Sequence, residues 1–160
     1  MATPPSGLYA RAMNDPAPET PARETGFALD PRLDGDTVPV GDLALSSVLL
    51  MNDARHPWLI LVPRRAGMVE IADLSEADAA ALMAEIRIAS RVLLEVAKPD
   101  KINVGTLGNM VAQLHVHVIA RFASDPAWPG PVWGQGTRIP YPPHAAQALL
   151  ERLRTAFAAA

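Results

Sequence analysis

The sequence predicts an α+β fold with an antiparallel sheet of about five or more strands, one long helix and a C-terminal helix. Three observations support this prediction. Short apolar runs bounded by turn residues flank one long helical pattern, two of these runs are joined by a hairpin-like turn, and a second helical pattern ends the chain. With 160 residues, the chain is long enough for one domain with its own core.

The composition excludes several classes of function. Apolar residues make up 49% of the chain and charged residues 19%, which is an ordinary globular balance. The formal net charge is −3 and the largest basic cluster is Arg64-Arg65, so a nucleic-acid partner is not expected. The absence of cysteine excludes disulfides, thiolate nucleophiles and zinc–sulfur sites. No signal peptide and no bilayer-length apolar run is visible, so we expect a cytoplasmic protein without a membrane partner.

The chain divides into a short arm and one domain. Residues 1–25 are rich in Pro, Ala and Thr and are predicted to be a flexible arm, and residues 26–160 are predicted to be a single domain. At the start of the domain, Phe27–Leu29 and Thr37–Val40 resemble short edge strands, because each run precedes turn residues and Pro39 cannot donate to a ladder.

Two apolar strands form the predicted hairpin. They are Leu45–Met51 and Trp58–Pro63, joined by the polar, turn-forming residues 52–57. Such a short connection makes the pair antiparallel. The two strands are therefore expected to lie side by side in the sheet.

The long helix has a clear start and end. Ser75 is predicted as its N-cap with Asp78 as a capping-box-like acid, and Pro99 ends it. Its apolar stripe is formed by Leu82, Ile86, Ala89, Leu93 and Val96. Its polar residues are expected on the surface: Glu76, Glu85, Arg87 and Arg91. The C-terminal helix is predicted to begin near Pro142-Pro143 with a stripe of Leu149, Leu153 and Phe157.

The segment between the helices contains the most informative pattern. A strand over Lys101–Val104 and a loop over Gly105–Asn109 are predicted to precede a strand over Gln113–Arg121. Side chains alternate across a strand, so one face collects Gln113, His115, His117 and Ile119. The other face collects apolar residues that can fill a core: Leu114, Val116, Val118 and Ala120. Two imidazoles and an amide are therefore expected to lie next to one another.

The histidine pair alone leaves three interpretations open. Two polar residues on a solvated strand face would produce the same pattern. A metal site is a second interpretation, with a third ligand from His56, His144 or an acidic residue. The third is nucleophilic catalysis by a neutral imidazole, which needs one ring nitrogen free and the other held by an acceptor.

The wider pattern resembles the signature of a known family. Gly108-Asn109-x-Val111-x-Gln113-x-His115-x-His117-Val118-Ile119-x-Arg121 is similar to the histidine triad (HIT) signature, Gly-Gln-x-Val-x-His-φ-His-φ-His-φ-φ with φ apolar. The resemblance covers roughly residues 45–122, because Asn52 after an apolar strand, the long helix and Asn103 occur in the family's order. It suggests a bacterial-type HIT protein with Gln at the first triad position, a HIT-like α+β fold and a homodimer.

The resemblance also implies an activity. His115 matches the family's nucleophile, which would attack the α-phosphate of a dinucleoside polyphosphate or nucleoside phosphoramidate through a nucleotidyl-His intermediate. His117 and Gln113 would assist, without a cofactor or a metal ion. The nucleotide-binding residues implied by the resemblance are Asn52, Asp53, Asn103 and Asn109. Gln113 and Asn109 depart from the signature, and because Gln113 cannot carry a proton, the alternative is a nucleotide-binding module with weak or no turnover.

Five further residues complete the predictions. His56 and His144 are expected to be surface residues. Trp128 and Trp133 lie in an irregular loop over residues 125–136. They either stack on a base or cover a ligand pocket, or they attach the loop to the core or to a dimer partner. Arg121 ends the strand on the histidine face, where a phosphate contact and a surface salt bridge are both open interpretations.

Overall fold

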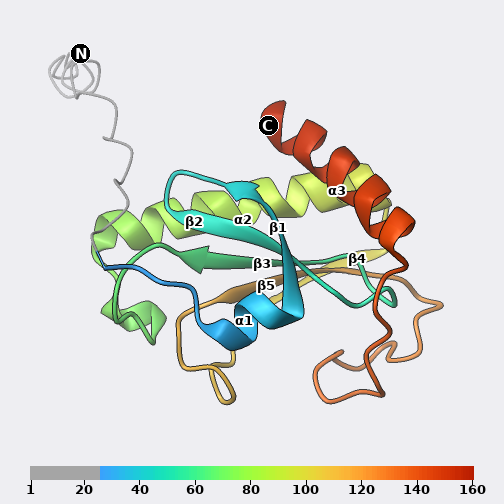
Figure 1. The fold of residues 1–160 in the computed structure, drawn as a ribbon, viewed down its shortest axis with the longest axis horizontal. Coiled ribbons are helices and arrows are strands. Elements are labelled where there is room, and N and C mark those ends of the chain that lie inside the picture. The colour runs from blue at the N-terminus through green and yellow to red at the C-terminus, as the bar shows by residue number, and fades with distance from the viewer. Residues whose placement is uncertain (1–25) are drawn as a thin grey trace, which may run out of the picture.

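A computed structural model describes residues 26–160, which form an antiparallel sheet with helices on both faces. The strands are β1 (Thr37–Asp42), β2 (Ser46–Met51), β3 (Trp58–Pro63), β4 (Lys101–Gly105) and β5 (Val116–Arg121). They form one sheet in the order β1-β2-β3-β5-β4, and all neighbours are antiparallel (Figure 1). The predicted α+β class is therefore confirmed. The predicted arm over residues 1–25 lies outside the described residues.

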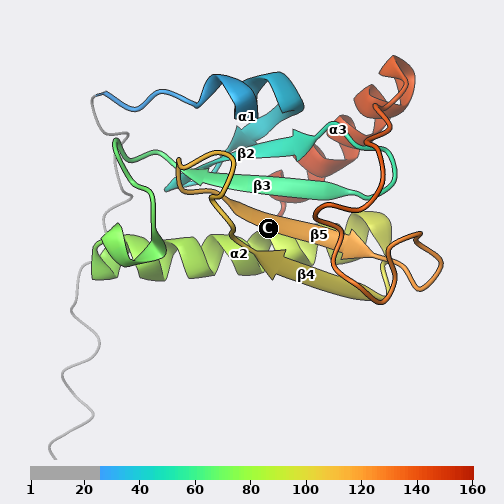
Figure 2. The same ribbon diagram turned by 90° about the horizontal axis from the view of Figure 1, so that it is seen from below.

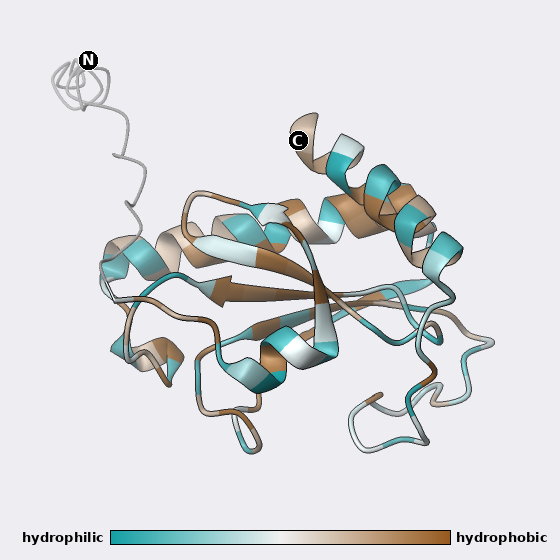
Figure 3. Ribbon diagram, viewed as in Figure 1, coloured by the Kyte–Doolittle hydropathy of each residue, from teal (hydrophilic) through white to brown (hydrophobic). Residues whose placement is uncertain are grey.

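The centre of the sheet consists of apolar strands. β2 and β3 form the predicted hairpin, with Leu49 opposite Ile60. All six residues of β3 are buried, and Figure 3 shows this strand as hydrophobic along its length. Both faces of β3 are therefore covered, which explains why its sequence lacks the alternation of a half-exposed strand.

The strand that bears the histidines is shorter than predicted. β5 begins at Val116, whereas the sequence predicted a strand from Gln113. Extending the β3–β5 register, in which Leu61 lies opposite Val116, would place Pro63 opposite Leu114. Proline has no N–H to donate, and the N–H of Leu114 instead donates to the carbonyl of Met68 at 2.9 Å. Residues 113–115 are therefore a loop that leads into the strand.

The long helix α2 (Glu76–Ala97) begins and ends where the sequence predicted. The hydroxyl of Ser75 accepts the N–H of Asp78 at 3.1 Å, which confirms the N-cap. Lys98 adopts a left-handed conformation (φ 51°) and terminates the helix before Pro99. The carboxylate of Asp78 does not form a capping box, because it pairs with Arg65 at 2.7 Å. A 3₁₀ turn, η1 (Ile71–Asp73), precedes the helix.

Two helices cover one face of the sheet. α2 and α3 (Pro143–Ala158) pack against each other and against β1, β3 and β5. Their apolar side chains form the main core with the strands: Leu82, Leu93 and Leu153 are each at most 3% exposed. Figure 2 shows the sheet between α2 on one side and α1 (Pro31–Asp36) on the other. None of the helices in residues 26–160 has the length and apolar character needed to span a bilayer.

The opposite face carries α1, which the sequence analysis missed. Asp30 caps this helix by accepting the N–H of Arg32 at 2.9 Å, and Pro31 occupies its first turn. The strand expected at Phe27–Leu29 is absent, because these side chains pack onto the core under α1 without pairing with the sheet. The edge strand predicted at Thr37–Val40 is confirmed as β1, which extends to Asp42 and has a register shift between Pro39 and Gly41.

Glu85 on α2 corrects a further prediction. It was expected on the surface, but it is only 4% exposed. Its carboxylate accepts the N–H groups of Leu45 at 2.6 Å and of Ser46 at 3.0 Å. The start of β2 is buried beneath the helix, so these two N–H groups need an acceptor that water cannot supply.

Candidate active site

A cavity of about 360 Å³ opens on the α1 face of the sheet. Its walls come from α1, from the sheet face of β2, β3 and β5, from the loop before β5 and from the loop after it. The lining residues are Leu33, Asp36, Met51, Trp58, Ile60, Leu107, Gly108, Asn109, Met110, Val111, His115, His117, Trp133 and Gly134. Both predicted histidines therefore face the same cavity.

His115 and His117 lie next to each other at the start of β5. Their ring centroids are 4.8 Å apart with an angle of 83° between the rings, and the side chains are 6% and 8% exposed. His117 lies opposite Ile60 of β3, whereas His115 immediately precedes the strand. The alternation predicted from the sequence is confirmed from Val116 onward, because Val116, Val118 and Ala120 enter the main core on the other face.

The hydrogen bonding of His115 frees one of its ring nitrogens. Nδ1 of His115 lies 2.7 Å from the backbone carbonyl of Gln113. A carbonyl oxygen only accepts, so Nδ1 carries the hydrogen and donates it. In the neutral ring, Nε2 then has a free lone pair, which is the state that a nucleophilic imidazole requires.

His117 has the opposite arrangement. The indole N–H of Trp58 donates to Nδ1 of His117 at 3.0 Å, so this nitrogen accepts and the ring hydrogen lies on Nε2. Burial, together with the neighbouring His115, lowers the pKa of His117 from 6.5 to about 3. His117 is therefore neutral at physiological pH and presents a hydrogen-bond donor at Nε2.

Aromatic side chains surround the ring of His117. Trp58 and Trp133 contact it edge-on, with ring centroids 5.3 Å and 5.6 Å away. Trp133 also packs against Gly105, where an added Cβ would lie 2.8 Å from the indole. The sequence analysis left the role of Trp133 open and missed Trp58. The sequence places residues 58 and 60 on one strand face, but the pairing of this strand with β5 is visible only in the fold.

The loop over residues 107–111 forms the polar rim of the cavity. Gly108 adopts a left-handed conformation (φ 72°), and Asn109 lines the cavity as predicted. The N–H groups of residues 108–111 donate to no other group in the part of the chain that the structure describes. No Lys or Arg is among the lining residues, so an anion in this cavity would be bound by N–H groups of the loop and by His117.

Gln113 lies near the histidines, but its side chain is directed elsewhere. Its Oε1 accepts the N–H of Asp30 at 2.9 Å, and its Nε2 donates to the carbonyl of Ala28 at 2.9 Å. The side-chain amide of Gln113 thus pairs with backbone groups of the extended segment before α1, as a neighbouring strand would. The supporting role expected for Gln113 at the reacting group is not reflected in these contacts.

Asn52 and Asp53 do not line the cavity. Asn52 accepts the N–H of Tyr141 through Oδ1 at 2.9 Å. Asp53 is 1% exposed and pairs with Arg55 at 2.6 Å, and the hydrogen bonds from Arg55 lower the pKa of its buried carboxyl group. Both side chains hold the connection between residues 135 and 141 against the β2–β3 turn. Their predicted contact with ribose therefore stays a prediction.

Asn103 and Arg121 form a network at the far end of β5. Arg121 is 1% exposed and donates to Asp125 at 2.8 Å, to Asn103 at 2.7 Å and to the carbonyl of Gly130 at 3.0 Å. This ion pair lowers the pKa of Asp125 to about 2. The guanidinium also lies 5.8 Å from the ring of Trp128. The salt bridge considered for Arg121 exists but is buried, and Asn103 does not line the cavity.

The other two histidines do not join the pair. His56 was expected on the surface but is 1% exposed, because the loop after β5 covers it, and its Nδ1 lies 3.9 Å from Asp125. His144 is exposed at the start of α3, as predicted. Within residues 26–160, no three His, Asp or Glu side chains come together as a metal-binding group. A third ligand for the metal interpretation is therefore not found among these residues.

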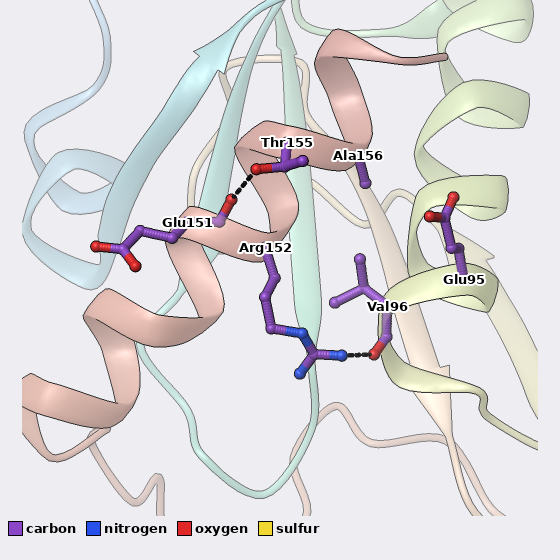
Figure 4. A pocket seen from close by; sticks show the side chains of 6 residues that line it. All are labelled: Glu95, Val96, Glu151, Arg152, Thr155 and Ala156. Atoms are coloured by element: carbon purple, nitrogen blue, oxygen red, sulfur yellow. Dashed lines mark hydrogen bonds between the residues drawn. The ribbon is translucent and has the colours of Figure 1, made fainter.

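A second hollow of about 340 Å³ lies between α2 and α3, on the other face of the sheet (Figure 4). Two of its polar side chains donate to backbone carbonyls of these helices. Arg152 donates to the carbonyl of Val96, and Thr155 donates to the carbonyl of Glu151 at 2.9 Å. This hollow lacks the paired imidazoles of the first, so we regard the histidine cavity as the candidate active site.

Comparison with known proteins gives a consistent family match. A family model described as the HIT domain matches residues 33–124. The structure is similar to that of a histidine triad protein from Sinorhizobium meliloti 1021, with 47% identity and a TM-score of 0.80 over 82% of this chain and 97% of that one. A histidine triad protein from Bradyrhizobium japonicum is 49% identical, with a TM-score of 0.80 over 82% of this chain and 98% of that one.

A curated relative is also similar over part of the chain. It is named AP-4-A phosphorylase, from Mycobacterium tuberculosis (strain CDC 1551 / Oshkosh), and is 37% identical over 73 residues. The match covers 42% of this chain and 37% of the relative. The chain therefore spans little more than a third of the length of this relative.

Proposed function

The chain belongs to the HIT domain family, and we propose that it binds a nucleotide conjugate and cleaves it at the α-phosphate with His115 as the nucleophile. The observation that supports this proposal most directly is the hydrogen bond from Nδ1 of His115 to the carbonyl of Gln113 at 2.7 Å. It directs the free lone pair of the ring to Nε2. The side chain lines a cavity in which a phosphate group can be held.

The proposed reaction has two steps. Nε2 of His115 attacks the α-phosphorus, a P–N bond forms, and the bond from phosphorus to the leaving group breaks. A water molecule, or another acceptor, then attacks the nucleotidyl-His intermediate, loses a proton and releases the nucleotide from His115. Dividing one displacement into two is the usual advantage of covalent catalysis.

The surroundings supply donors for the charge that develops on phosphorus. Nε2–H of His117 and the N–H groups of residues 108–111 border the cavity, and the side chain of Asn109 lies among them. Donors held in place before the reaction stabilise such charge without reorganisation. We assign Asn109 to the leaving group, and we assign the apolar wall of Trp133, Met51 and Leu33 to the base.

The family and the relative support a choice of substrates to test. The curated relative is named for AP-4-A, so a dinucleoside polyphosphate is the first substrate to test, and a nucleoside phosphoramidate is the second.

We further propose a homodimer in the cytoplasm. The open edge of β4, where Val104 is 47% exposed, supports the dimer.

A second candidate function is nucleotide binding with weak or no turnover. Gln113 at the first triad position favours it, because an amide cannot carry a proton and both of its polar atoms already bond to residues 28 and 30. Single-turnover measurements with diadenosine tetraphosphate would separate the two functions, because a binding module forms no adduct.

Replacing the nucleophile tests the main proposal. His115→Ala should reduce turnover by about a thousandfold or more, since the nucleophile is removed. The wild-type protein, mixed with diadenosine tetraphosphate and quenched at alkaline pH, should show the mass of a nucleotidyl adduct that this variant lacks. His144→Ala is the matched control, because His144 is an exposed histidine outside the cavity. Turnover that survives in His115→Ala would refute the proposal.

A further inference from the structure

Trp58 is the only indole in residues 26–160 whose N–H bonds to a histidine. In the sheet, Trp58 lies opposite Ile119 and His117 lies opposite Ile60, so Trp58 and His117 are diagonal neighbours on one face. This arrangement brings Nε1 of Trp58 to 3.0 Å from Nδ1 of His117. An indole nitrogen only donates, so the direction of this hydrogen bond is fixed.

The contact is protected from water. Trp58 is 6% exposed and His117 is 8% exposed, and their rings meet at 71°. Trp133 covers another side of the imidazole, and its own Nε1 is buried without a hydrogen-bond partner in the described residues. Only one of the two tryptophans that touch His117 therefore controls where its hydrogen lies.

We propose that Trp58 is a positioning residue, whose indole N–H holds His117 in the tautomer with hydrogen on Nε2. The consequence for catalysis rests on the function proposed above. In this tautomer, His117 donates a hydrogen bond to a phosphate or leaving-group oxygen. In the other tautomer, Nε2 would present a lone pair to that oxygen and repel it.

The tautomer matters because His117 stays neutral. A protonated imidazole would donate from both nitrogens and would need no orienting partner. Burial and the neighbouring His115 keep the pKa of His117 near 3, so the protein must select between two neutral forms. Within residues 26–160, Trp58 is the group that makes this selection.

Two matched variants test the proposal. Trp58→Phe keeps an aromatic ring but removes the donor to His117, whereas Trp133→Phe removes an N–H that has no partner. Nitrogen-15 spectra of the His117 ring should show a protonated Nε2 and an unprotonated Nδ1 in the wild-type protein and in Trp133→Phe. Trp58→Phe should show a mixture of both tautomers. A single Nε2–H tautomer in Trp58→Phe would overturn the proposal.

A measurement on the wild-type protein covers the case in which Trp58→Phe does not fold. Scalar coupling between Nε1 of Trp58 and Nδ1 of His117 across the hydrogen bond should be detectable, and its absence would overturn the proposal.

The kcat of Trp58→Phe should fall about tenfold, as expected for one hydrogen bond, while KM changes less than kcat. The spectra need no substrate. If the tautomer shifts but the wild-type protein forms no nucleotidyl adduct, the proposed function fails and the role of Trp58 in selecting the tautomer stands.

Discussion

At the scale of single residues, two adjacent imidazoles are given opposite properties by their partners. Nδ1 of His115 faces a carbonyl, which only accepts, and Nδ1 of His117 faces an indole N–H, which only donates. Nε2 is therefore a lone pair in one ring and a donor in the other. A nucleophile and a donor to the developing charge are the two groups that the proposed displacement requires.

The low pKa of His117 predicts a pH-dependent stability. The unfolded chain binds a proton on this histidine below about pH 6.5, whereas the folded protein resists protonation until about pH 3. Acidification through this interval therefore favours the unfolded state, by up to about 1.4 kcal/mol per pH unit from this residue. Lowering the pH from 7 to 5 should cost about 2 kcal/mol, and buried His56, whose pKa is also lowered, shifts stability in the same direction.

Urea unfolding at pH 7 and pH 5 checks this prediction. His117→Asn should lose less unfolding free energy on acidification than the wild-type protein does, because it lacks the histidine that makes the free energy of unfolding depend on pH in this range. The carboxylates with lowered pKa values take up protons at lower pH, as Asp125 with a pKa of about 2 illustrates. Equal losses in both proteins would show that His117 is not protected from protonation.

At the scale of elements, the site depends on central strands that carry different residues on their two faces. β5 sends Val118 into the main core and His117 into the cavity, and β3 sends Leu59 and Trp58 to the same two sides. α2 packs directly against β5 and β3, and it also contacts the start of β2. Glu85 makes this contact by accepting two backbone N–H groups at the start of β2.

Removal of the Glu85 side chain should lower the stability of the protein. Glu85→Ala leaves two buried N–H groups without an acceptor, so the free energy of unfolding should fall by about 2–3 kcal/mol. Chemical denaturation measures the change. Glu95→Ala is the matched control on the same helix, because Glu95 is exposed, and its effect should stay within about 0.5 kcal/mol. Similar losses in both variants would contradict the role assigned to Glu85.

At the scale of the whole molecule, the cavity is enclosed by segments that the sheet does not hold directly. Gln113 binds the segment before α1, and Asn52 and Asp53 bind the connection that leads from the Trp133 loop to α3. Arg138 lies in this connection and forms an ion pair with Asp36, which lines the cavity; Nη1 of Arg138 is 2.5 Å from Oδ1 of Asp36. The walls therefore depend on hydrogen bonds between parts of the chain that are distant in sequence.

Replacing Asn52 distinguishes a structural role of this residue from the ribose contact that the family resemblance suggested. If it holds Tyr141, Asn52→Ala should lower the free energy of unfolding by about 1 kcal/mol, with KM for the nucleotide changed less than about twofold. We expect this result, because Asn52 does not line the cavity. Asn109→Ala is the comparison variant inside the cavity and should affect kcat or KM. An increase in KM of about tenfold in Asn52→Ala, without a loss of stability, would support the ribose contact.

The features that depend on local patterns could be predicted from the sequence. The alternation from Val116 to Arg121, the cap at Ser75 and the β2–β3 hairpin each follow from residues that are close in sequence. The spacing of His115 and His117 likewise identified the histidine pair. The hydrogen-bond partners of the side chains, in contrast, became clear only from the fold. Gln113 bonds to Ala28 across 85 positions, and His56 and Glu85 are buried by segments far along the chain. Periodicity describes the direction in which a side chain points, whereas its hydrogen bonds depend on which distant segment packs there.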